Sequence, residues 1–383
     1  MAVDTGTEPH PAFIDLANLR QAGAGQPLPE GTCLYIQSGD PSDFDGYLAA
    51  AAGHAMAECT RQLTFAVVVP ERRATSNRSE ADLNAHDPEF SNQVMHTAGR
   101  LLQALCPSAF VVFGPLNQRN IIPQKFITHE PEKYAPVLGA LRAASAGCVR
   151  WESVGSLARL VESKEVTSVM LDMLGAVGYL DSLAATCPSL GPKVKASGLP
   201  LAIMAGILAE AETTTLRMPG RDPRSTMNAI YHQPTMLLSL AQQHSLPLLF
   251  VTNNAANSIL KFEDDKELVS GLGLQGTLKL IAECWYGPHL KGKYVPFDWV
   301  ALVALLLVNR YPTMIRTERR QLWVGKADTS VLVLKLPGAA DIEVARANLE
   351  GAVLWGEVDS VTHIDRSLLC HLARQLSERQ AHC

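Results

Sequence analysis

The stretch Gly-Asp-Pro-Ser-Asp-Phe-Asp-Gly (39–46) places three carboxylates, Asp40, Asp43 and Asp45, close together in the chain. An apolar run that predicts a strand precedes it, and an alanine-rich segment that predicts a helix follows. Carboxylate oxygens are ligands that calcium prefers, and a metal-bound water beside a carboxylate can carry out hydrolysis. Aspartate is also a preferred residue at a helix start, so helix capping explains the same pattern equally well.

Two later stretches add polar candidates. In Tyr-Val-Pro-Phe-Asp-Trp (294–299), Asp298 stands at the first turn of a strongly apolar predicted helix. Asn228 precedes another predicted helix, and Asn253 and Asn254 directly follow a predicted strand. An acid at a helix start is usually only a cap, but the flanking aromatic residues of Asp298 raise the question of what its carboxylate faces.

The elements around these residues alternate between short apolar runs and helical patterns. Such alternation predicts an α/β fold of three layers (α/β/α) with a mainly parallel central sheet, because parallel strands are covered by helices on both faces. The predicted strands are 33–37, 63–69, 109–114, 165–171, 199–204 and 246–251. The predicted helices are 46–60, 89–105, 134–146, 153–163, 172–186, 233–244, 264–286 and 298–310.

The domain organisation follows from the same pattern. Residues 1–30 are rich in proline and glycine and predict a flexible or docked N-terminal arm. Residues 31–383 predict a single domain, in which 320–336 alternates as a β-hairpin does. Ligands of such sheets bind beyond the carboxyl ends of the strands, where Asp40, Asn253 and Asn254 are expected.

Composition excludes several classes of function. The net charge is −5 and no block rich in lysine and arginine occurs, so nothing indicates binding to nucleic acid or to an anionic membrane. The longest apolar run, 300–308, is too short to span a bilayer, and residues 1–30 lack the apolar core of a signal peptide. The eight cysteines are scattered singly and form no Cys-x-x-Cys pair. We therefore expect a soluble intracellular protein with reduced thiols, whose compartment the sequence leaves open.

Taken in order, the motifs resemble those of the inosine/uridine-preferring nucleoside hydrolase family. That family opens with a strand, Asp-x-Asp-Pro-Gly-x-Asp-Asp and a helix, and it closes its site with His-Asp-Pro at a helix start. The matching text here is SGDPSDFD (38–45), IMAG (203–206), TMNAIYHQPTM (226–236), LPLLFVTNNAAN (246–257) and FDWVA (297–301).

The resemblance implies a calcium site. Its ligands would be the carboxylates of Asp40, Asp45 and Asp298 and the backbone carbonyl of about Ala256. Three carboxylates and a carbonyl supply most of a calcium shell, which water or sugar hydroxyls can complete. By the same resemblance Asp40 is the general base of an active member, and Asp298 also contacts substrate.

Other family positions are changed. The first aspartate of the opening motif is Ser38, and the aspartate that binds ribose hydroxyls is Phe44. The Glu-Phe-Asn motif becomes Thr226-Met227-Asn228, which keeps only the asparagine, and the histidine before the last aspartate is Phe297. These are positions at which a nucleoside hydrolase stabilises the ribosyl cation and protonates the leaving base.

Three interpretations remain open. The first is a catalytically impaired scaffold or binding protein (a pseudoenzyme) that keeps a calcium site and works through a protein partner on its surface or N-terminal arm. The second is an active calcium-dependent ribonucleoside N-glycosidase of altered specificity, with Asn228, Asn253, Asn254 and Asp298 as substrate-binding residues. The third is an unrelated α/β protein whose aspartates are caps. The resemblance also implies a homo-oligomer.

Overall fold

The computed structural model describes most of the 383-residue chain. The described residues are 31–39, 44–59, 62–70, 73–75, 87–114, 121–123, 139, 151–174, 178–208, 235–285, 294–309, 311–324, 332–337 and 353–382. Within them, no helix is long and apolar enough to cross a membrane.

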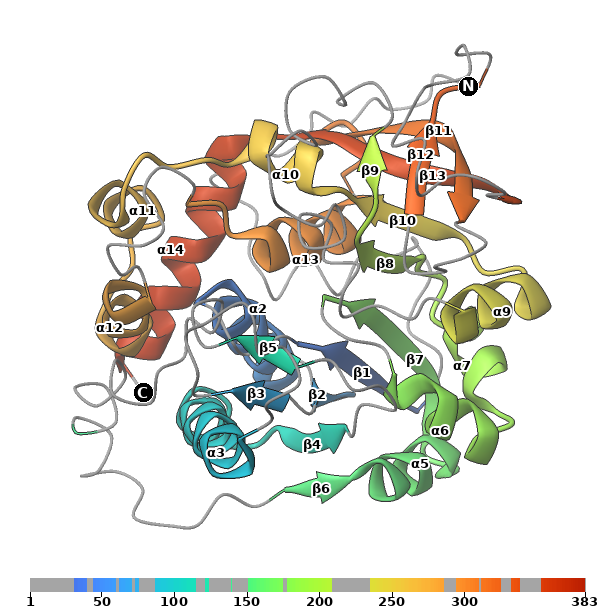
Figure 1. The fold of residues 1–383 in the computed structure, drawn as a ribbon, viewed down its shortest axis with the longest axis horizontal. Coiled ribbons are helices and arrows are strands. Elements are labelled where there is room, and N and C mark those ends of the chain that lie inside the picture. Colours follow the sequence, from blue (N-terminus) through green and yellow to red (C-terminus); the bar gives the residue numbers. More distant parts are fainter. Residues whose placement is uncertain are drawn as a thin grey trace, which may run out of the picture.

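An eleven-stranded sheet runs through the molecule in the order β6-β4-β2-β1-β7-β8-β10-β13-β11-β12-β9 (Figure 1). From β6 to β13 every neighbouring pair is parallel, and β13, β11 and β12 pair antiparallel. A separate two-stranded sheet joins β3 (Arg73–Thr75) and β5 (Ile121–Pro123). The strands of the main sheet are β1 (Thr32–Ser38), β2 (Leu63–Pro70), β4 (Phe110–Gly114), β6 (Glu152–Ser153), β7 (Val166–Met173), β8 (Leu201–Met204), β9 (Ile207–Leu208), β10 (Leu248–Val251), β11 (Ile315–Val324), β12 (Leu332–Lys335) and β13 (Val353–Ile364).

The central strands are rich in apolar side chains, as expected for strands that are buried on both faces. Alternate side chains of β1 divide between the two faces: Tyr35 belongs to one core cluster, and Leu34 and Ile36 belong to the other. The structure therefore has two cores, one on each side of the sheet.

The larger core packs one layer of helices against the sheet. These helices are α2 (Phe44–Cys59), α3 (Pro88–Leu105), α10 (Asn253–Ile259), α11 (Asp265–Gly271), α12 (Gly276–Trp285), α13 (Phe297–Leu307) and α14 (Arg366–His382). The opposite core is covered by α5 (Val154–Glu162), α6 (Tyr179–Thr186), α7 (Leu190–Ala196) and α9 (Thr235–His244). In Figure 1 the second group follows the right-hand edge of the sheet.

The predicted three-layer α/β/α architecture with a mainly parallel sheet is confirmed. Two predicted helix boundaries are wrong. The segment 172–186 begins as strand, since β7 continues to Met173 and α6 starts only at Tyr179. The segment 264–286 forms two helices, α11 and α12, which are separated at glycines with positive φ, Gly273 and Gly276.

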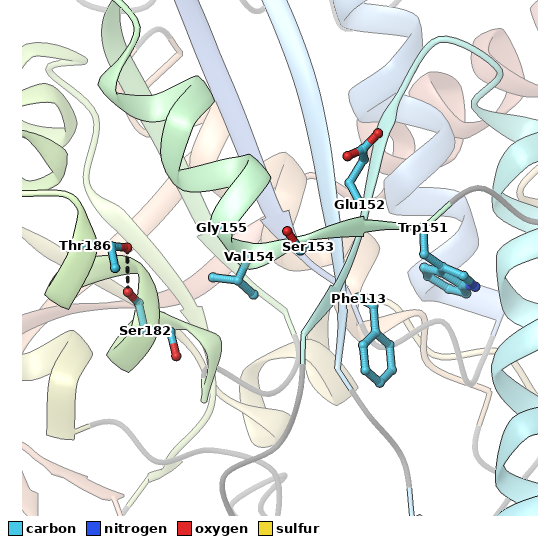
Figure 2. A pocket seen from close by; sticks show the side chains of 8 residues that line it. All are labelled: Phe113, Trp151, Glu152, Ser153, Val154, Gly155, Ser182 and Thr186. Atoms are coloured by element: carbon cyan, nitrogen blue, oxygen red, sulfur yellow. Dashed lines mark hydrogen bonds between the residues drawn. The ribbon is translucent and has the colours of Figure 1, made fainter.

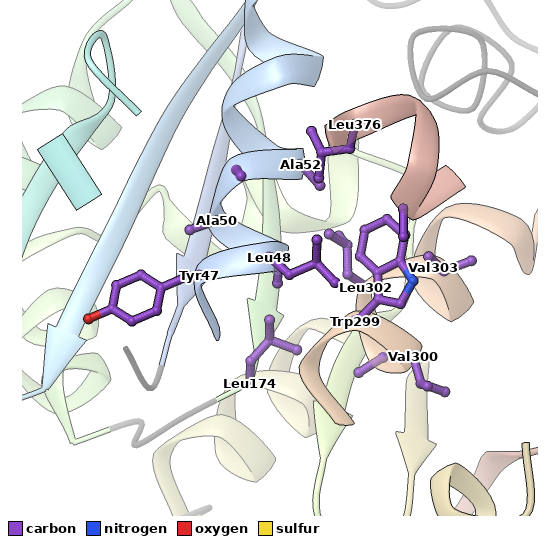
Figure 3. Packing of buried hydrophobic residues seen from close by; sticks show 14 of the residues in the cluster. Tyr47, Leu48, Ala50, Ala52, Leu174, Trp299, Val300, Leu302, Val303 and Leu376 are labelled. Carbon is purple, nitrogen blue, oxygen red and sulfur yellow. The ribbon is translucent and has the colours of Figure 1, made fainter. Parts of the chain in front are cut away.

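Helices α2 and α13 pack against each other and carry the candidate residues at their amino ends. In Figure 3, Leu48 and Ala52 of α2 lie toward Trp299 and Leu302 of α13, whereas Ala50 lies on the side of α2 that carries Tyr47. Small residues on one helix let the backbone of the other approach closely. The fully buried Trp299 also donates its indole N–H to the Leu369 carbonyl of α14 at 3.1 Å. This contact ties α13 to the last helix.

Candidate functional site

Asp45 and Asp298 meet in the buried space between the first turns of α2 and α13. The Asp45 Oδ2 accepts a hydrogen bond from the backbone N–H of Asp298 at 3.0 Å. Both side chains are about 2% exposed, although the residues lie 253 positions apart in the chain. Asp45 thus supplies an acceptor to an N-terminal N–H of α13 that has no partner within the helix.

Two phenylalanines flank these carboxylates. Phe44 is fully buried in the larger core, at 0% exposure. Phe297, the residue before Asp298, is partly buried and packs against the same core. An aromatic residue thus directly precedes each carboxylate in the chain, and both aromatic side chains pack in or against the larger core.

Sequence reasoning missed a third buried acid, Asp172, which lies near the carboxyl end of β7. Its Oδ2 accepts a hydrogen bond from the Tyr35 hydroxyl at 3.1 Å. Tyr35 in turn accepts from the Gln37 Nε2 at 3.1 Å, and Gln37 is the cross-strand neighbour of Asp172 in the β1–β7 register. All three side chains are 0% exposed. The signal was present in the sequence as a charged residue that ends an apolar run.

Burial dominates the electrostatics of this cluster. It raises the pKa of Asp172 to about 7, and the hydrogen bond from Tyr35 opposes the shift. Burial also raises the pKa of Tyr35 well above its ordinary value, and the charges of Asp172 and Asp298 add to the shift. Tyr35 therefore stays protonated as a donor, while Asp172 can gain or lose its proton near neutral pH.

Among the described residues, two acceptor oxygens of the cluster find no hydrogen-bond donor: the Asp172 Oδ1 and the Gln37 Oε1. A buried acceptor without a donor is costly, and a proton on Asp172 reduces that cost for the carboxyl group. The two oxygens belong to facing residues of β1 and β7, just before the acidic stretch 39–46 begins.

Helix α10 follows the carboxyl end of β10, and its start is capped by Thr252, whose Oγ1 accepts from the Ala255 N–H at 3.2 Å. The fully buried Ala256 uses its carbonyl to accept from the Leu260 N–H at 2.9 Å. A metal ligand at this position would have to use the second lone pair of that oxygen. Asn254 is half-buried on the first turn of α10.

Several predicted site residues lie outside the described part of the chain. Asp40 and Asp43 belong to the undescribed segment 40–43, and Asn228 and Thr226 to the segment 209–234. The backbone of Asn253 is described as the first residue of α10, but its side chain is not. The described residues contain no group of three or more His, Cys, Asp or Glu side chains that could hold a metal ion.

A surface cavity of about 530 Å³ lies at the other end of the sheet, where β4 and β6 meet α5 and α6 (Figure 2). Phe113 and Trp151 form its aromatic wall, with ring centroids 6.1 Å apart in a T-shaped arrangement. Thr186 on its rim already donates to the Ser182 carbonyl at 2.7 Å. Asp45, Asp172 and Asp298 do not line this cavity, and in the sheet β2 lies between β1 and its lining strand β4.

No protein-family profile and no curated protein sequence matches the chain. Solved structures do match it. An inosine-uridine preferring nucleoside hydrolase from Bacillus anthracis has a TM-score of 0.58 at 12% identity, and the match covers 91% of this chain and 99% of that one. A purine-preferring ribonucleoside hydrolase from Gardnerella vaginalis has a TM-score of 0.53 at 12% identity, covering 92% and 100%. The chain thus has a nucleoside-hydrolase-like fold along nearly its whole length.

Proposed function

We propose that this protein is a nucleoside-hydrolase-like scaffold or binding protein that keeps a calcium site but has lost efficient hydrolysis. The observation that carries the proposal is the complete burial of Phe44. By the resemblance, this position belongs to the aspartate that binds ribose hydroxyls. A phenylalanine packed into the core offers no hydrogen bond to a sugar, and loss of a buried polar partner for a hydroxyl costs several orders of magnitude.

The metal part of the proposal rests on Asp45 and Asp298. The structure brings the first turns of α2 and α13 into contact through these two residues. Buried carboxylates are tolerated where they are hydrogen-bonded or coordinate a cation. With Asp40 they would supply three carboxylates to calcium, and a bound calcium ion would link the strand end of β1 to α13.

The test is release of free base from a panel of purine and pyrimidine ribonucleosides with calcium present. We expect the wild-type chain to release no more base than the Asp40→Asn variant. Binding of the same nucleosides, measured by calorimetry, should also be absent. Circular dichroism of both proteins shows whether each is folded during the assay.

The alternative, an active N-glycosidase of altered specificity, has its own signature. Base release by the wild type that Asp40→Asn abolishes would establish it and overturn the scaffold proposal. The next residues to substitute would then be the proposed ribose contacts, Asn228, Asn253, Asn254 and Asp298.

Assembly belongs to the same proposal, since a scaffold works through its partners. We infer a homo-oligomer from the similarity to the nucleoside hydrolase fold. Light scattering coupled to size-exclusion chromatography tests this directly, because a 41.4 kDa monomer and its dimer are well separated in mass.

A further inference from the structure

Gln37, Tyr35 and Asp172 form a chain of two hydrogen bonds that joins β1 to β7. The Gln37 Nε2 donates to the Tyr35 hydroxyl, and this hydroxyl donates to the Asp172 Oδ2, each at 3.1 Å. The chain ends at two oxygens, the Gln37 Oε1 and the Asp172 Oδ1, which find no donor among the described residues. Because Gln37 and Asp172 are register partners and both contact Tyr35, the two ends of the chain leave the sheet on the same face.

The number of hydrogens in the chain fixes the orientation of the Gln37 amide. A phenol carries one hydrogen, and Tyr35 gives it to Asp172. The part of the amide that faces the Tyr35 oxygen must therefore be the NH2 group, which turns the carbonyl oxygen of Gln37 away from Tyr35. Of the two oxygens at the ends of the chain, only the one on Asp172 can take up a proton.

A proton on the Asp172 Oδ1 converts this chain into a ring. Asp172 then donates to the Gln37 Oε1, so that each of the three side chains donates one hydrogen bond and accepts one. The last torsion of an aspartate or glutamine side chain has a broad energy minimum, so a small rotation brings the two oxygens together. The ring removes the cost of two buried acceptors at once, in a place where all three side chains are 0% exposed.

We propose that Gln37, Tyr35 and Asp172 form a proton-dependent latch, a closed ring of three hydrogen bonds that opens when Asp172 loses its proton. In the open state the Asp172 carboxylate and the Gln37 carbonyl are two acceptors that repel each other. The Gln37 amide then turns over, offers its NH2 group to Asp172 and gives up its hydrogen bond to Tyr35.

The latch lies where two central strands end. Beyond it, the Leu174 N–H donates to the Ser38 carbonyl at 3.0 Å, which continues the pairing of β7 with β1 to their last residues. The acidic stretch 39–46 begins directly after Ser38. Opening of the latch therefore loosens the strand end from which this stretch continues.

The titratable groups around Asp172 keep its proton near the point of release at neutral pH. Burial raises the pKa of Asp172 to about 7, and the hydrogen bond from Tyr35 opposes that shift. Burial and the charge of Asp172 raise the pKa of Tyr179, at the start of α6. On the side of α13 and α2 lie the acids Asp298, whose charge raises the pKa of Tyr35, and Asp45. Among the described residues, neither lysine, arginine nor histidine shifts the pKa of Asp172.

The test follows two side chains of the full-length protein by NMR from pH 5 to pH 9. A chelator is present, so that the result does not depend on calcium. Isotope-labelled aspartate carboxyls report the charge of Asp172, whose signal is the one missing from Asp172→Asn. The side-chain amide of Gln37 is assigned through its own backbone signals. We expect both groups to change with one midpoint, near pH 7.

Two controls separate the latch from a general effect of pH. In Asp172→Asn the Gln37 amide should not respond to pH, because the asparagine NH2 group keeps the ring closed. The amide of Gln62, exposed at the start of β2, should not follow the midpoint of Asp172 in the wild type. A Gln37 amide that ignores the titration of Asp172 overturns the proposal, and so does an Asp172 that keeps one charge state throughout.

Hydrogen exchange of the Leu174 N–H measures the loosening of the strand end. The ratio of its exchange rates in wild type and Asp172→Asn at the same pH cancels the intrinsic effect of pH. This ratio should rise about tenfold from pH 6 to pH 8.5, because local opening relieves the ionised, buried carboxylate. The Glu267 N–H at the start of α11 should show a constant ratio. A constant ratio at Leu174 as well would contradict the latch.

Discussion

A carboxyl group with no access to water, such as that of Asp172, costs the folded state free energy whenever it is ionised. Its single described hydrogen bond, from Tyr35, offsets only part of that cost. Asp172 is thus expected to be neutral below about pH 7 and charged above it. Its ionisation then contributes to the pH dependence of stability.

The sign of that contribution follows from the two pKa values. The carboxyl group of an aspartate in the unfolded chain has a pKa of about 3.9, whereas burial raises the pKa of Asp172 in the folded protein to about 7. Between these values the folded protein retains a proton that the unfolded chain has released. The free energy of unfolding therefore falls as pH rises from about 4 to about 7 and then levels off.

Asp172→Asn should remove this dependence while keeping an acceptor for Tyr35. Relative to wild type, the variant should gain about 2–3 kcal/mol in free energy of unfolding between pH 5 and pH 8. Urea denaturation across that range measures the gain. Glu89→Gln, at an exposed position of α3, should follow wild type, and an equal slope in wild type and Asp172→Asn would contradict the assignment.

We also predict that calcium binding stabilises the folded chain through the carboxylate of Asp298. A ligand present at about one hundred times its dissociation constant stabilises the folded state by about 2.7 kcal/mol. We expect calcium to raise the Tm of the wild-type chain and to leave that of Asp298→Asn unchanged, because the variant removes a proposed ligand charge.

The control for calcium is Asp264→Asn. Asp264 caps α11 by accepting from the Glu267 N–H at 2.7 Å, so its loss should lower stability without altering the calcium increment. A wild-type Tm that is insensitive to both calcium and a chelator would end the calcium proposal.

Among the elements, α2 lies unusually close to strand β2. A Cβ atom added at Gly53 would come within 2.5 Å of the Phe65 ring. Alanine at a helix interior normally improves stability over glycine, but here the ring or the whole helix would have to move. The glycine is therefore part of how α2 sits over the sheet.

Gly53→Ala should lower the free energy of unfolding by about 1–3 kcal/mol, as overpacked core variants do. Gly155→Ala on α5 is the matched control, since the nearest atom to its Cβ would be the Ser153 Oγ at 3.6 Å. That exchange should be neutral or slightly stabilising. Denaturant titration of the two variants decides the point, and equal stability losses would show that the close approach to Phe65 is unimportant.

Local patterns predicted the elements well where apolar runs were continuous, as in β1, β2 and β10. They failed where a strand includes a charged residue or lacks a continuous apolar run. Asp172 ended the predicted strand because a charged residue rarely continues an apolar run, yet β7 includes it. Strand β13 was not predicted, because it mixes exposed, half-buried and buried positions and lacks a continuous apolar run. Its structure depends on neighbours in the sheet.

For the molecule as a whole, the candidate site is formed by residues that lie far apart in the chain. A local sequence pattern cannot predict which of these residues meet. The resemblance placed Asp45 and Asp298 in one site, and the structure joins them across 253 positions. The cluster of Asp172, Tyr35 and Gln37 depended on the register of β1 against β7. A register is set by the complete hydrophobic pattern of two strands and not by either strand alone.

The position of β13 in the sheet has a consequence for biosynthesis. Among the described strands, β13 (353–364) comes last in the chain. In the eleven-stranded sheet it nevertheless occupies the eighth place, between β10 and β11. On the ribosome, the parallel half of the sheet waits with the edge of β10 open until these residues emerge, and an open edge invites pairing with other chains. A nascent chain arrested before residue 353 should therefore be protease-sensitive and prone to aggregate, and release of the full chain should restore protection. Chaperone demand during synthesis would then peak in the last stretch of translation.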